Sequence, residues 1–433
     1  MESKLTNKQY ISTVLPFIIS SLTTPLLGAV DTAVVGQLSS PIYLAGVSIG
    51  VTIFNTIFWV FGFLSVSTTG QSAQSLGNSQ KKIKAFIHPL VIAMVVSMMI
   101  IISKSPIWNI AMTILNPESN VQSQAKIYYD ILIYASPLNL INYVIIGWLM
   151  GQSKIKISVA IQVSGNVLNV ILDLLFVSIL GMKVEGVAIA TLISHIIVFI
   201  VGIIFVIKLG GVKVRYFFDK RFWDKKELTK ELSNNGDLMI RSICLIIVTN
   251  MFMAISTRLG TITLASNTIL LQIESIIGYF FGGISSGASI LTGKSIGENH
   301  KELVKDIVII TTKWSFYLII LISIIYILYG KSIISLFTNI EDVLNEINKY
   351  YLWMIPITLF SSLPISYAGI FIGLLNAKPI RNSMIQSLII FIILTSILID
   401  NYKNNGLWFS YSIYYLVRST VLIINIKNIV YSK

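Results

Sequence analysis

The chain has 433 residues, of which 55% are hydrophobic and only 12% are charged. Soluble domains carry roughly a quarter of their residues as charges, so this composition excludes an ordinary soluble domain and indicates an integral membrane protein. A formal net charge of +13 would suggest a nucleic-acid partner for a soluble protein. Here the Lys and Arg residues fall in alternate connections between apolar runs, so we expect no nucleic-acid partner and a lipid bilayer instead.

Apolar runs of about 20 residues, the length that spans a bilayer, follow one another along the whole chain. Lipid offers backbone groups no hydrogen-bond partner, so each run must be helical. The run from Thr32 to Gln80 is too long for one span, and the residues Gly36 to Pro41 provide a turn within it. We therefore predict an all-α integral membrane fold with twelve spans, at residues 12–36, 42–76, 86–110, 128–151, 155–179, 186–208, 236–259, 264–296, 306–329, 347–375, 381–400 and 405–428.

The basic residues predict the orientation of these spans. If the amino terminus and every second connection are cytoplasmic, 22 of the 32 Lys and Arg residues lie inside and seven lie outside. Cytoplasmic loops carry such an excess of basic residues. We expect a multi-pass protein of the cell's inner (plasma) membrane with both termini in the cytoplasm.

The first span contains an isolated acid, Asp31, with no other charged residue from Gln9 to Gln80. A carboxylate in hydrocarbon costs several kcal/mol or takes up a proton, so Asp31 is a candidate for ion coupling. Pro25 lies six residues earlier and removes one hydrogen-bond donor of the helix. It predicts a kink, and we take it as a candidate hinge.

The fifth span carries a polar face formed by Asn166, Asn169 and Asp173, at positions i, i+3 and i+7 of a helix. Such groups must face the helix bundle or a wet cavity rather than lipid. Oxygen ligands of this kind suit a proton or a small hard cation. The alternative is an interhelical hydrogen-bond cluster that serves adhesion alone.

The second half buries three charged residues, Glu274, Arg241 and Arg418. Arg418 is in the middle of a span, and a permanently charged guanidinium there needs a carboxylate, carbonyl groups or water. Pairing of Arg418 with Glu274 is conceivable, and for Arg241 a structural pin near the cytoplasmic end is the better interpretation. All three are candidate cavity-lining residues.

The two halves are tandem repeats. A shift of 220 residues superposes Leu44 and Ala45 on Leu264 and Ala265, Ile49 on Ile269, Gly62 on Gly282, Ser75 on Ser295, Gly77 on Gly297 and Lys81 on Lys301. Slightly larger shifts relate Gly147 and Gly151 to Gly369 and Gly373, and Gln162 to Gln386. An even number of spans in each half makes the repeats parallel.

These observations predict three parts of the chain. They are an amino-terminal six-helix lobe at 1–208, a charged cytoplasmic linker at 209–235 and a carboxy-terminal six-helix lobe at 236–433. Residues 225–231 of the linker fit either a surface amphipathic helix or a solvated loop.

No pattern indicates an enzyme. The segment from Ala288 to Ser295 matches a relaxed phosphate-loop motif, but that motif must follow a strand and open a helix in water. His88, His195 and His300 lie far apart and do not have the spacing of metal ligands. We therefore expect no metal and no cofactor other than a coupling proton or sodium ion.

Several stretches together resemble the multidrug and toxic compound extrusion (MATE) transporters, specifically their DinF-like branch. The resemblance runs nearly end to end, and its motifs are Pro16-x8-Pro25-Leu26-Leu27-Gly28-x2-Asp31-Thr32, Leu44-Ala45-Gly46, Phe61-Gly62-Phe63, Thr69-Gly70-Gln71, Gly147-Trp148-x2-Gly151, Asn166-x2-Asn169-x3-Asp173, Gly186-Val187-Ala188, Arg241-Ser242 and Gly406-Leu407-Trp408 with Arg418.

The resemblance implies roles for particular residues. Asp31, Asn169, Asp173 and Thr191 match the family's cation site in the amino-terminal lobe, where protonation or sodium binding alters the first helix. Asn142 matches a polar position of the fourth span. The NorM-like branch instead uses acids of the seventh and tenth spans, and this chain has none at the centre of either. This departure favours coupling through the first lobe.

The sequence therefore favours a monomeric secondary antiporter that exports amphipathic organic compounds, cations in preference to anions, in exchange for protons or sodium. A first alternative is a flippase or an exporter of anionic lipid-linked or organic-acid substrates, because the acids Asp31 and Asp173 are set against two buried cations, Arg241 and Arg418. A second alternative is a membrane scaffold that transports nothing. A scaffold, however, gives no reason to bury Asp31.

Overall fold

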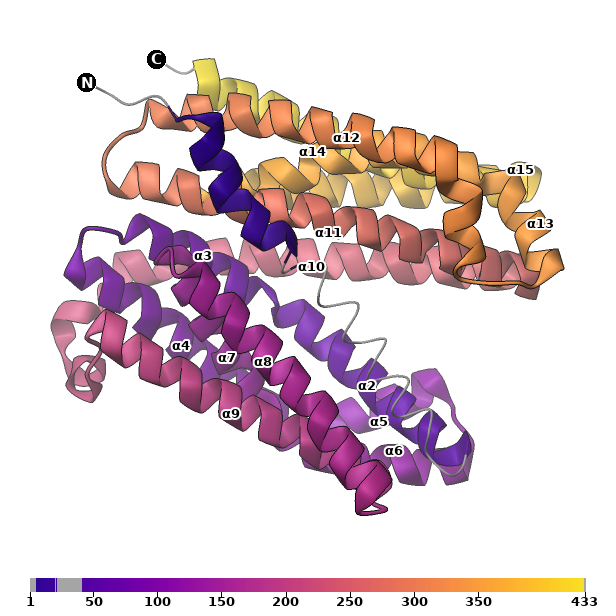
Figure 1. The fold of residues 1–433 in the computed structure, drawn as a ribbon, viewed down its shortest axis with the longest axis horizontal. Coiled ribbons are helices and arrows are strands. Elements are labelled where there is room, and N and C mark those ends of the chain that lie inside the picture. The colour runs from indigo at the N-terminus through magenta and orange to yellow at the C-terminus, as the bar shows by residue number, and fades with distance from the viewer. Residues whose placement is uncertain (1–4, 20, 22–40, 432–433) are drawn as a thin grey trace. The chain divides into compact units, whose positions relative to one another are not determined.

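The computed structural model describes residues 5–19, 21 and 41–431. Pro25 and Asp31 lie outside these described residues. Of the turn predicted at residues 36–41, only Pro41 is described. Within the described ranges every regular element is a helix. Figure 1 shows them as long rods joined by short connections.

An unlabelled helix covers residues 7–19 at the start of the chain. The helices of the first half that follow are α2 (Pro41–Phe61), α3 (Phe63–Gln74), α4 (Ser79–Ile102), α5 (Lys104–Leu115), α6 (Ser119–Leu132), η1 (Ile133–Ala135), α7 (Ser136–Gly151), α8 (Ile155–Asp173), η2 (Leu174–Ile179) and α9 (Val184–Gly210). The remaining helices are η3 (Val214–Phe218), η4 (Lys220–Phe222), α10 (Lys225–Arg258), α11 (Thr261–Gly297), α12 (Leu303–Ser335), α13 (Glu341–Tyr350), η5 (Tyr351–Trp353), α14 (Met354–Gly373) and α15 (Lys378–Tyr431).

Ten helical segments of the described chain are long and apolar enough to cross a membrane. The last of them joins two helices across Lys403, whose φ of 46° and ψ of −127° interrupt the helix. It therefore contains both of the final two predicted spans. The other nine coincide with the nine spans predicted between residues 42 and 375. The prediction of an all-α membrane fold is confirmed, and eleven of the twelve predicted spans fall in these segments. Most of the first predicted span, 12–36, lies outside the described residues.

The chain falls into two compact units. One contains residues 1–22 and 233–433, and the other contains residues 23–232. In the first unit the helix at 7–19 packs on α12, where Tyr10 Oη donates to Thr311 Oγ1 at 3.0 Å and Trp314 Nε1 donates to Asn7 Oδ1 at 3.1 Å. The segment 209–232, predicted as a linker, groups with the second unit.

The same close helix packing occurs in each unit. In the second unit, α7 crosses α3 so closely that a Cβ at Gly147 would overlap Ser65 O, and one at Gly151 would lie 2.5 Å from Thr69 O. In the first unit, α14 crosses α11 in the same way: a Cβ at Gly369 would overlap Ser285 O, and one at Gly373 would lie 2.5 Å from Ser289 O. Glycine lets membrane helices approach to backbone contact. The repeat seen in the sequence is thus a repeat of packing.

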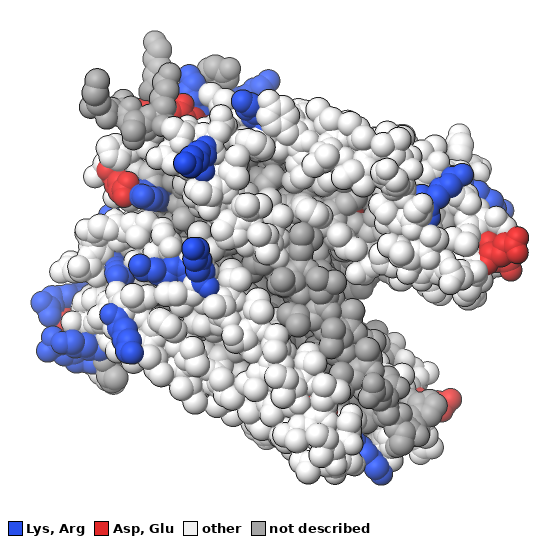
Figure 2. Space-filling model, in the orientation of Figure 1, with Lys and Arg blue, Asp and Glu red and all other residues white. Residues whose placement is uncertain are grey.

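Charged side chains gather at the ends of the helices, and the faces between those ends are almost free of them on the side shown in Figure 2. Large hydrophobic side chains of the membrane-length helices are exposed, for example Met98 at 67%, Ile102 at 80% and Leu328 at 67%. Such an exposed apolar surface is expected where lipid is the solvent.

The linker residues 225–231 are helical. They form the first turns of α10, which then continues without interruption to Arg258. Asp224 caps this helix, because its Oδ1 accepts from the backbone N–H groups of Lys226 at 2.7 Å and Glu227 at 3.3 Å. These two hydrogen bonds lower the pKa of the Asp224 carboxyl, and the bond from Lys226 has the larger effect. Of the two readings left open by the sequence, the helix is the one found.

Candidate functional site

The predicted polar face of the fifth span lies on α8. Asn169 Nδ2 donates to Asp173 Oδ2 at 3.3 Å, and Asp173 is only 1% exposed. Asn166 lies one turn earlier and is half-buried. A buried carboxylate with an amide donor is the kind of site that binds a proton or a small hard cation.

The helix widens immediately after Asp173. Residues 174–179 form the π-helix η2, and the N–H of Leu180 bonds back to Leu175 O at 2.9 Å. π-Turns inside α-helices are rare and occur frequently at functional sites. The wide turn places Asp173 at the junction of two helical geometries. No pattern in the sequence indicates this junction.

Two neighbouring helices bring further polar groups to this unit. Asn142 on α7 donates through Nδ2 to the backbone carbonyl of His195 on α9 at 3.1 Å. Its Oδ1 is buried and has no hydrogen-bond partner among the described residues. Thr191 lies one turn before His195 and donates to Val187 O of its own helix at 3.0 Å. α9 packs along α8, so Thr191 and Asp173 belong to adjacent helices (Figure 1).

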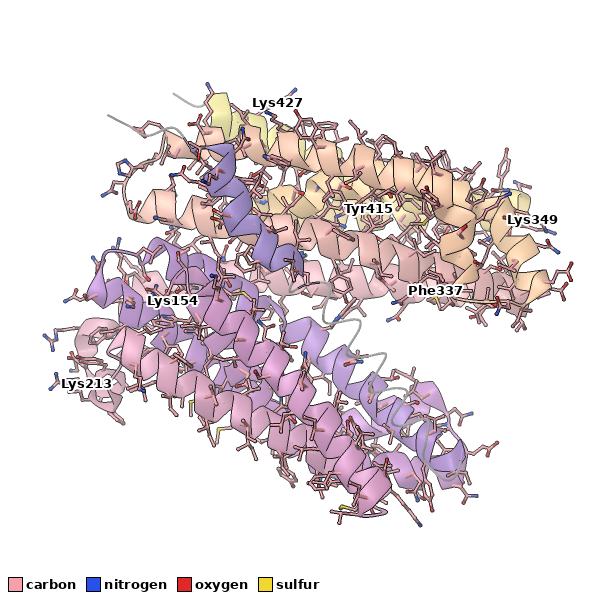
Figure 3. The ribbon with its side chains drawn as sticks, viewed as in Figure 1. Lys154, Lys213, Phe337, Lys349, Tyr415 and Lys427 are labelled. Atoms are coloured by element: carbon pink, nitrogen blue, oxygen red, sulfur yellow. The ribbon has the colours of Figure 1, made fainter. Side chains whose placement is uncertain are left out.

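The structure brings together the three charged residues of the second half. Tyr415 Oη donates to Glu274 Oε1 at 2.8 Å, and the guanidinium of Arg418 lies over the rings of Tyr414 and Tyr415 at 5.4 Å and 5.3 Å. Tyr415 lies midway along its helix bundle, between the ends marked by Lys427 and Lys349 (Figure 3).

Arg241 belongs to this group, since its charge is close enough to that of Arg418 for the two to repel each other. The direct hydrogen-bond partner of Glu274 is a tyrosine, Tyr415, and not an arginine. From the sequence, Arg418 was a conceivable partner of Glu274, and Arg241 was expected to be a structural pin near the cytoplasmic end. The tyrosines were missed because nothing in their spacing indicates which helix they face.

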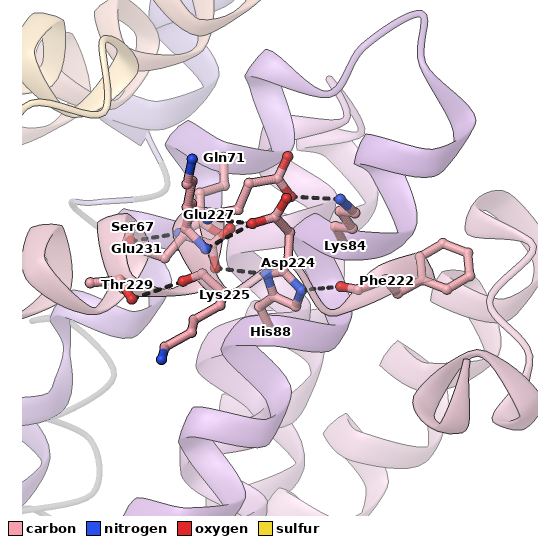
Figure 4. Close-up of polar contacts among 11 residues, drawn as sticks. Ser67, Gln71, Lys84, His88, Phe222, Asp224, Lys225, Glu227, Thr229 and Glu231 are labelled. Carbon is pink, nitrogen blue, oxygen red and sulfur yellow. Dashed lines mark hydrogen bonds and ion pairs between the residues drawn. The ribbon is translucent and has the colours of Figure 1, made fainter. Parts of the chain in front are cut away.

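A polar cluster also holds the linker against α4 (Figure 4). His88 Nδ1 lies 2.9 Å from Glu231 Oε2, and His88 Nε2 lies 2.6 Å from Phe222 O. The carboxylate and the carbonyl only accept hydrogen bonds, so both ring nitrogens must donate and the imidazole is doubly protonated. Lys84 pairs with Glu227 at 2.6 Å beside them. From the sequence, His88 was judged only for metal-ligand spacing, which it lacks, and this contact was not predicted.

The segment that resembles a phosphate loop is part of a helix. Residues 288–295 lie inside α11, and Gly293 N is 3.0 Å from where a Cβ of Gly373 would be. A phosphate-binding loop needs free backbone amides after a strand. The segment instead packs against α14.

Together these features define a multi-pass membrane transporter built from two parallel repeats. The chain belongs to the MatE family, whose sequence profile matches it twice, at residues 16–175 and 238–397. The second match begins 222 residues after the first, in agreement with the repeat. The predicted resemblance to MATE transporters of the DinF-like branch is confirmed.

Two curated relatives support this assignment. The chain is 31% identical to DNA damage-inducible protein F of Escherichia coli (strain K12) over 413 residues, which are 94% of this chain and 89% of that protein. It is 24% identical to the uncharacterized transporter YisQ of Bacillus subtilis (strain 168), over 76% of this chain and 75% of that protein.

Solved structures share the fold. One is an outward-facing multidrug resistance MATE family transporter of the MOP superfamily, with a TM-score of 0.85, 18% identity, and coverage of 98% of this chain and 96% of that one. Another is a MOP superfamily transporter from Pyrococcus furiosus Vc1, described as having a binding pocket of reversed polarity. It has a TM-score of 0.83, 18% identity and full coverage of both chains.

Proposed function

We propose that this protein is a secondary antiporter that exports amphipathic organic cations in exchange for protons or sodium. The observation that carries the proposal is Asp173, a carboxylate that is 1% exposed within a spanning helix and accepts a hydrogen bond from Asn169. A buried carboxylate of this kind is strongly disfavoured unless it binds an ion or a proton. Because the chain belongs to a transporter family, we take binding of that ion to drive substrate export.

In this proposal Asp31 and Asp173 bind one coupling ion, with Asn169 and Thr191 as neutral ligands. Two carboxylates in a poorly solvated site repel each other, so a single proton or sodium ion stabilises the pair. Movement of the first helix, with Pro25 as its hinge, would link ion binding to release of the substrate. Asn142 and Asn166 would line the surrounding cavity.

The experiment is a double-mutant cycle on ion-driven efflux from proteoliposomes, with Asp31→Asn and Asp173→Asn. The amide keeps the shape of the side chain and removes its titration. Groups that act on one ion are not independent, so either substitution should abolish nearly as much transport as both together. Two partial defects that add in free energy would contradict a shared site.

Thr191→Val provides a graded test of the neutral ligands, and Thr113→Val, on an exposed hydroxyl of α5, is its matched control. We expect a weaker dependence on ion concentration for the first and no change for the second. A substrate panel with organic cations, organic anions and fluorescent lipids completes the test. Export of anions or lipid scrambling without cation export would favour the alternative functions.

A further inference from the structure

A group of three charges in the carboxy-terminal half, one buried and two half-buried, is unbalanced. It contains Arg241 on α10, Glu274 on α11 and Arg418 on α15, two positive charges against one negative charge. All three belong to one compact unit, and Arg418 is only 4% exposed. A net charge enclosed by protein in a membrane is costly unless a counter-ion or water compensates it.

The hydrogen bonds within this group leave donors unused. In the part of the chain that the structure describes, none of the ion pairs involves Arg241, Glu274 or Arg418. Arg418 makes a long hydrogen bond of 3.5 Å to Tyr414 Oη, and its buried Nε has no acceptor among the described residues. A guanidinium has five donors and accepts nothing, so it is suited to an anion, and none of the described acidic residues forms an ion pair with Arg418.

The acid of the group is already occupied. Glu274 Oε1 accepts from Tyr415 Oη at 2.8 Å, and the hydroxyl groups of Tyr411 and Tyr415 lie 3.2 Å apart. Attraction between Glu274 and Arg418 operates across space, without a direct contact. Glu274 therefore offsets part of the positive charge and leaves the Arg418 donors available.

The surroundings favour a small ligand with one charge. Phe252, Phe391 and Trp408 are buried among the same rings, with Trp408 at 6.2 Å and Phe391 at 6.3 Å from Tyr411. Apolar walls strengthen any electrostatic attraction inside them. Arg241 is only half-buried, so the structure leaves part of its side chain accessible.

We propose that Arg241 and Arg418 form a binding site for a monovalent anion, either a free halide or a carboxylate group. One such anion would bring the net charge of the group to zero, whereas a dianion would reverse it. The site is separate from the proposed cation site of the other compact unit. It does not depend on the proposed antiport, because the anion would bind at equilibrium without any gradient.

The test uses the intact protein purified in detergent. The midpoint of thermal unfolding is measured while chloride replaces sulfate, a dianion, at constant ionic strength, and then while butyrate replaces sulfate. A ligand that binds only the folded state raises the midpoint. A shift with chloride alone identifies a halide site, and a shift with butyrate identifies a carboxylate site. No shift with either anion would overturn the proposal.

Four variants make the test specific. Arg418→Gln and Arg241→Gln should each raise the half-saturating anion concentration by about thirtyfold or more, since each removes a positive charge that would face the anion. Arg258→Gln removes an exposed arginine of α10 and should change nothing. Glu274→Gln should act in the opposite direction and tighten binding, because it removes the only negative charge of the three.

If Arg418→Gln fails to fold, Glu274→Gln still tests the proposal, because it should tighten anion binding instead of weakening it. An anion response that is the same in Glu274→Gln and in the unmodified protein would also overturn the proposal. Loss of anion binding with intact cation-driven efflux, or the reverse, would show which of the two proposals fails. The two sites are thus tested separately.

Discussion

Asp173 shows how the energetics of one residue lead to a hypothesis of function. Its carboxylate is buried in a helix whose neighbouring positions are mostly apolar, and Asn169 is its amide donor. If adhesion between helices were its only purpose, a neutral side chain would serve better, because interhelical hydrogen bonds gain only about 1 kcal/mol in membranes. The substitution Asp173→Asn separates the two interpretations, since it should preserve insertion and folding while abolishing ion-coupled export.

Asp224 gives a prediction that depends on pH. Its folded-state pKa is lowered by hydrogen bonds from the backbone N–H groups of Lys226 and Glu227. The stabilisation is therefore fully present above the unfolded-state pKa and is lost as pH falls through the folded-state pKa. We expect the Glu227 amide to exchange with solvent faster in acid, beyond the intrinsic pH effect, as measured by hydrogen exchange.

Asn is as good an N-cap as Asp but does not titrate. In Asp224→Asn the protection of the Glu227 amide should be the same at acid pH and at neutral pH. In Asp224→Ala this protection should be absent at both. Protection in the unmodified protein that does not change with pH would contradict this role for Asp224.

At the scale of helices, the glycines of α14 set how closely two elements approach. Gly373→Ala places a Cβ 2.5 Å from Ser289 O on α11, and overpacking of this kind costs about 1–3 kcal/mol. Gly278 on α11 has open space around its Cβ position. Gly278→Ala should therefore be neutral or stabilise the protein by about 0.4–1 kcal/mol. Thermal unfolding in detergent would measure both, and equal effects would show that the close crossing does not determine stability.

The contact between the linker and α4 depends on one carboxylate. Glu231→Ala would leave the fully buried Nδ1 of His88 without its acceptor, at a cost of about 1–3 kcal/mol. The matched control is Lys84→Gln, which removes a pair whose side chains are 19% and 50% exposed, and should cost at most about 1 kcal/mol. Both are measured as unfolding midpoints at neutral pH. A larger loss in Lys84→Gln than in Glu231→Ala would contradict the imidazolium contact.

Much of the helical architecture was predictable because lipid imposes strict rules. Span length, the absence of charge and glycine spacing indicate helices, and the 220-residue shift indicates the repeat. The break at Lys403 was also predicted, as the gap between two spans. Tertiary contacts were less accessible. The spacing of Asn169 and Asp173 on one helix predicts their hydrogen bond, whereas Tyr415 reaches Glu274 across 141 positions, and no local pattern indicates such a pair.

The charge distribution predicts the orientation of the whole molecule in the membrane, and this prediction has a direct test. Cys244 is the only cysteine and is 5% exposed, so Cys244→Ala provides a background without thiols. In that background Phe218→Cys places a thiol in the linker, at a position where the native side chain is 85% exposed. The excess of basic residues predicts that the linker is cytoplasmic. A membrane-impermeant maleimide should label Phe218→Cys in inside-out vesicles and leave it unlabelled in intact cells.

The matched position is Ile340, which is 63% exposed between α12 and α13, in a connection predicted to be outside. Ile340→Cys should show the reverse pattern, with labelling in intact cells and protection in inside-out vesicles. With the six spans predicted before residue 218 and the three predicted after residue 340, the two results together would place both termini in the cytoplasm. If both thiols reacted from the same side, the number of spans between residues 218 and 340 would have to be even, and the predicted topology would be wrong.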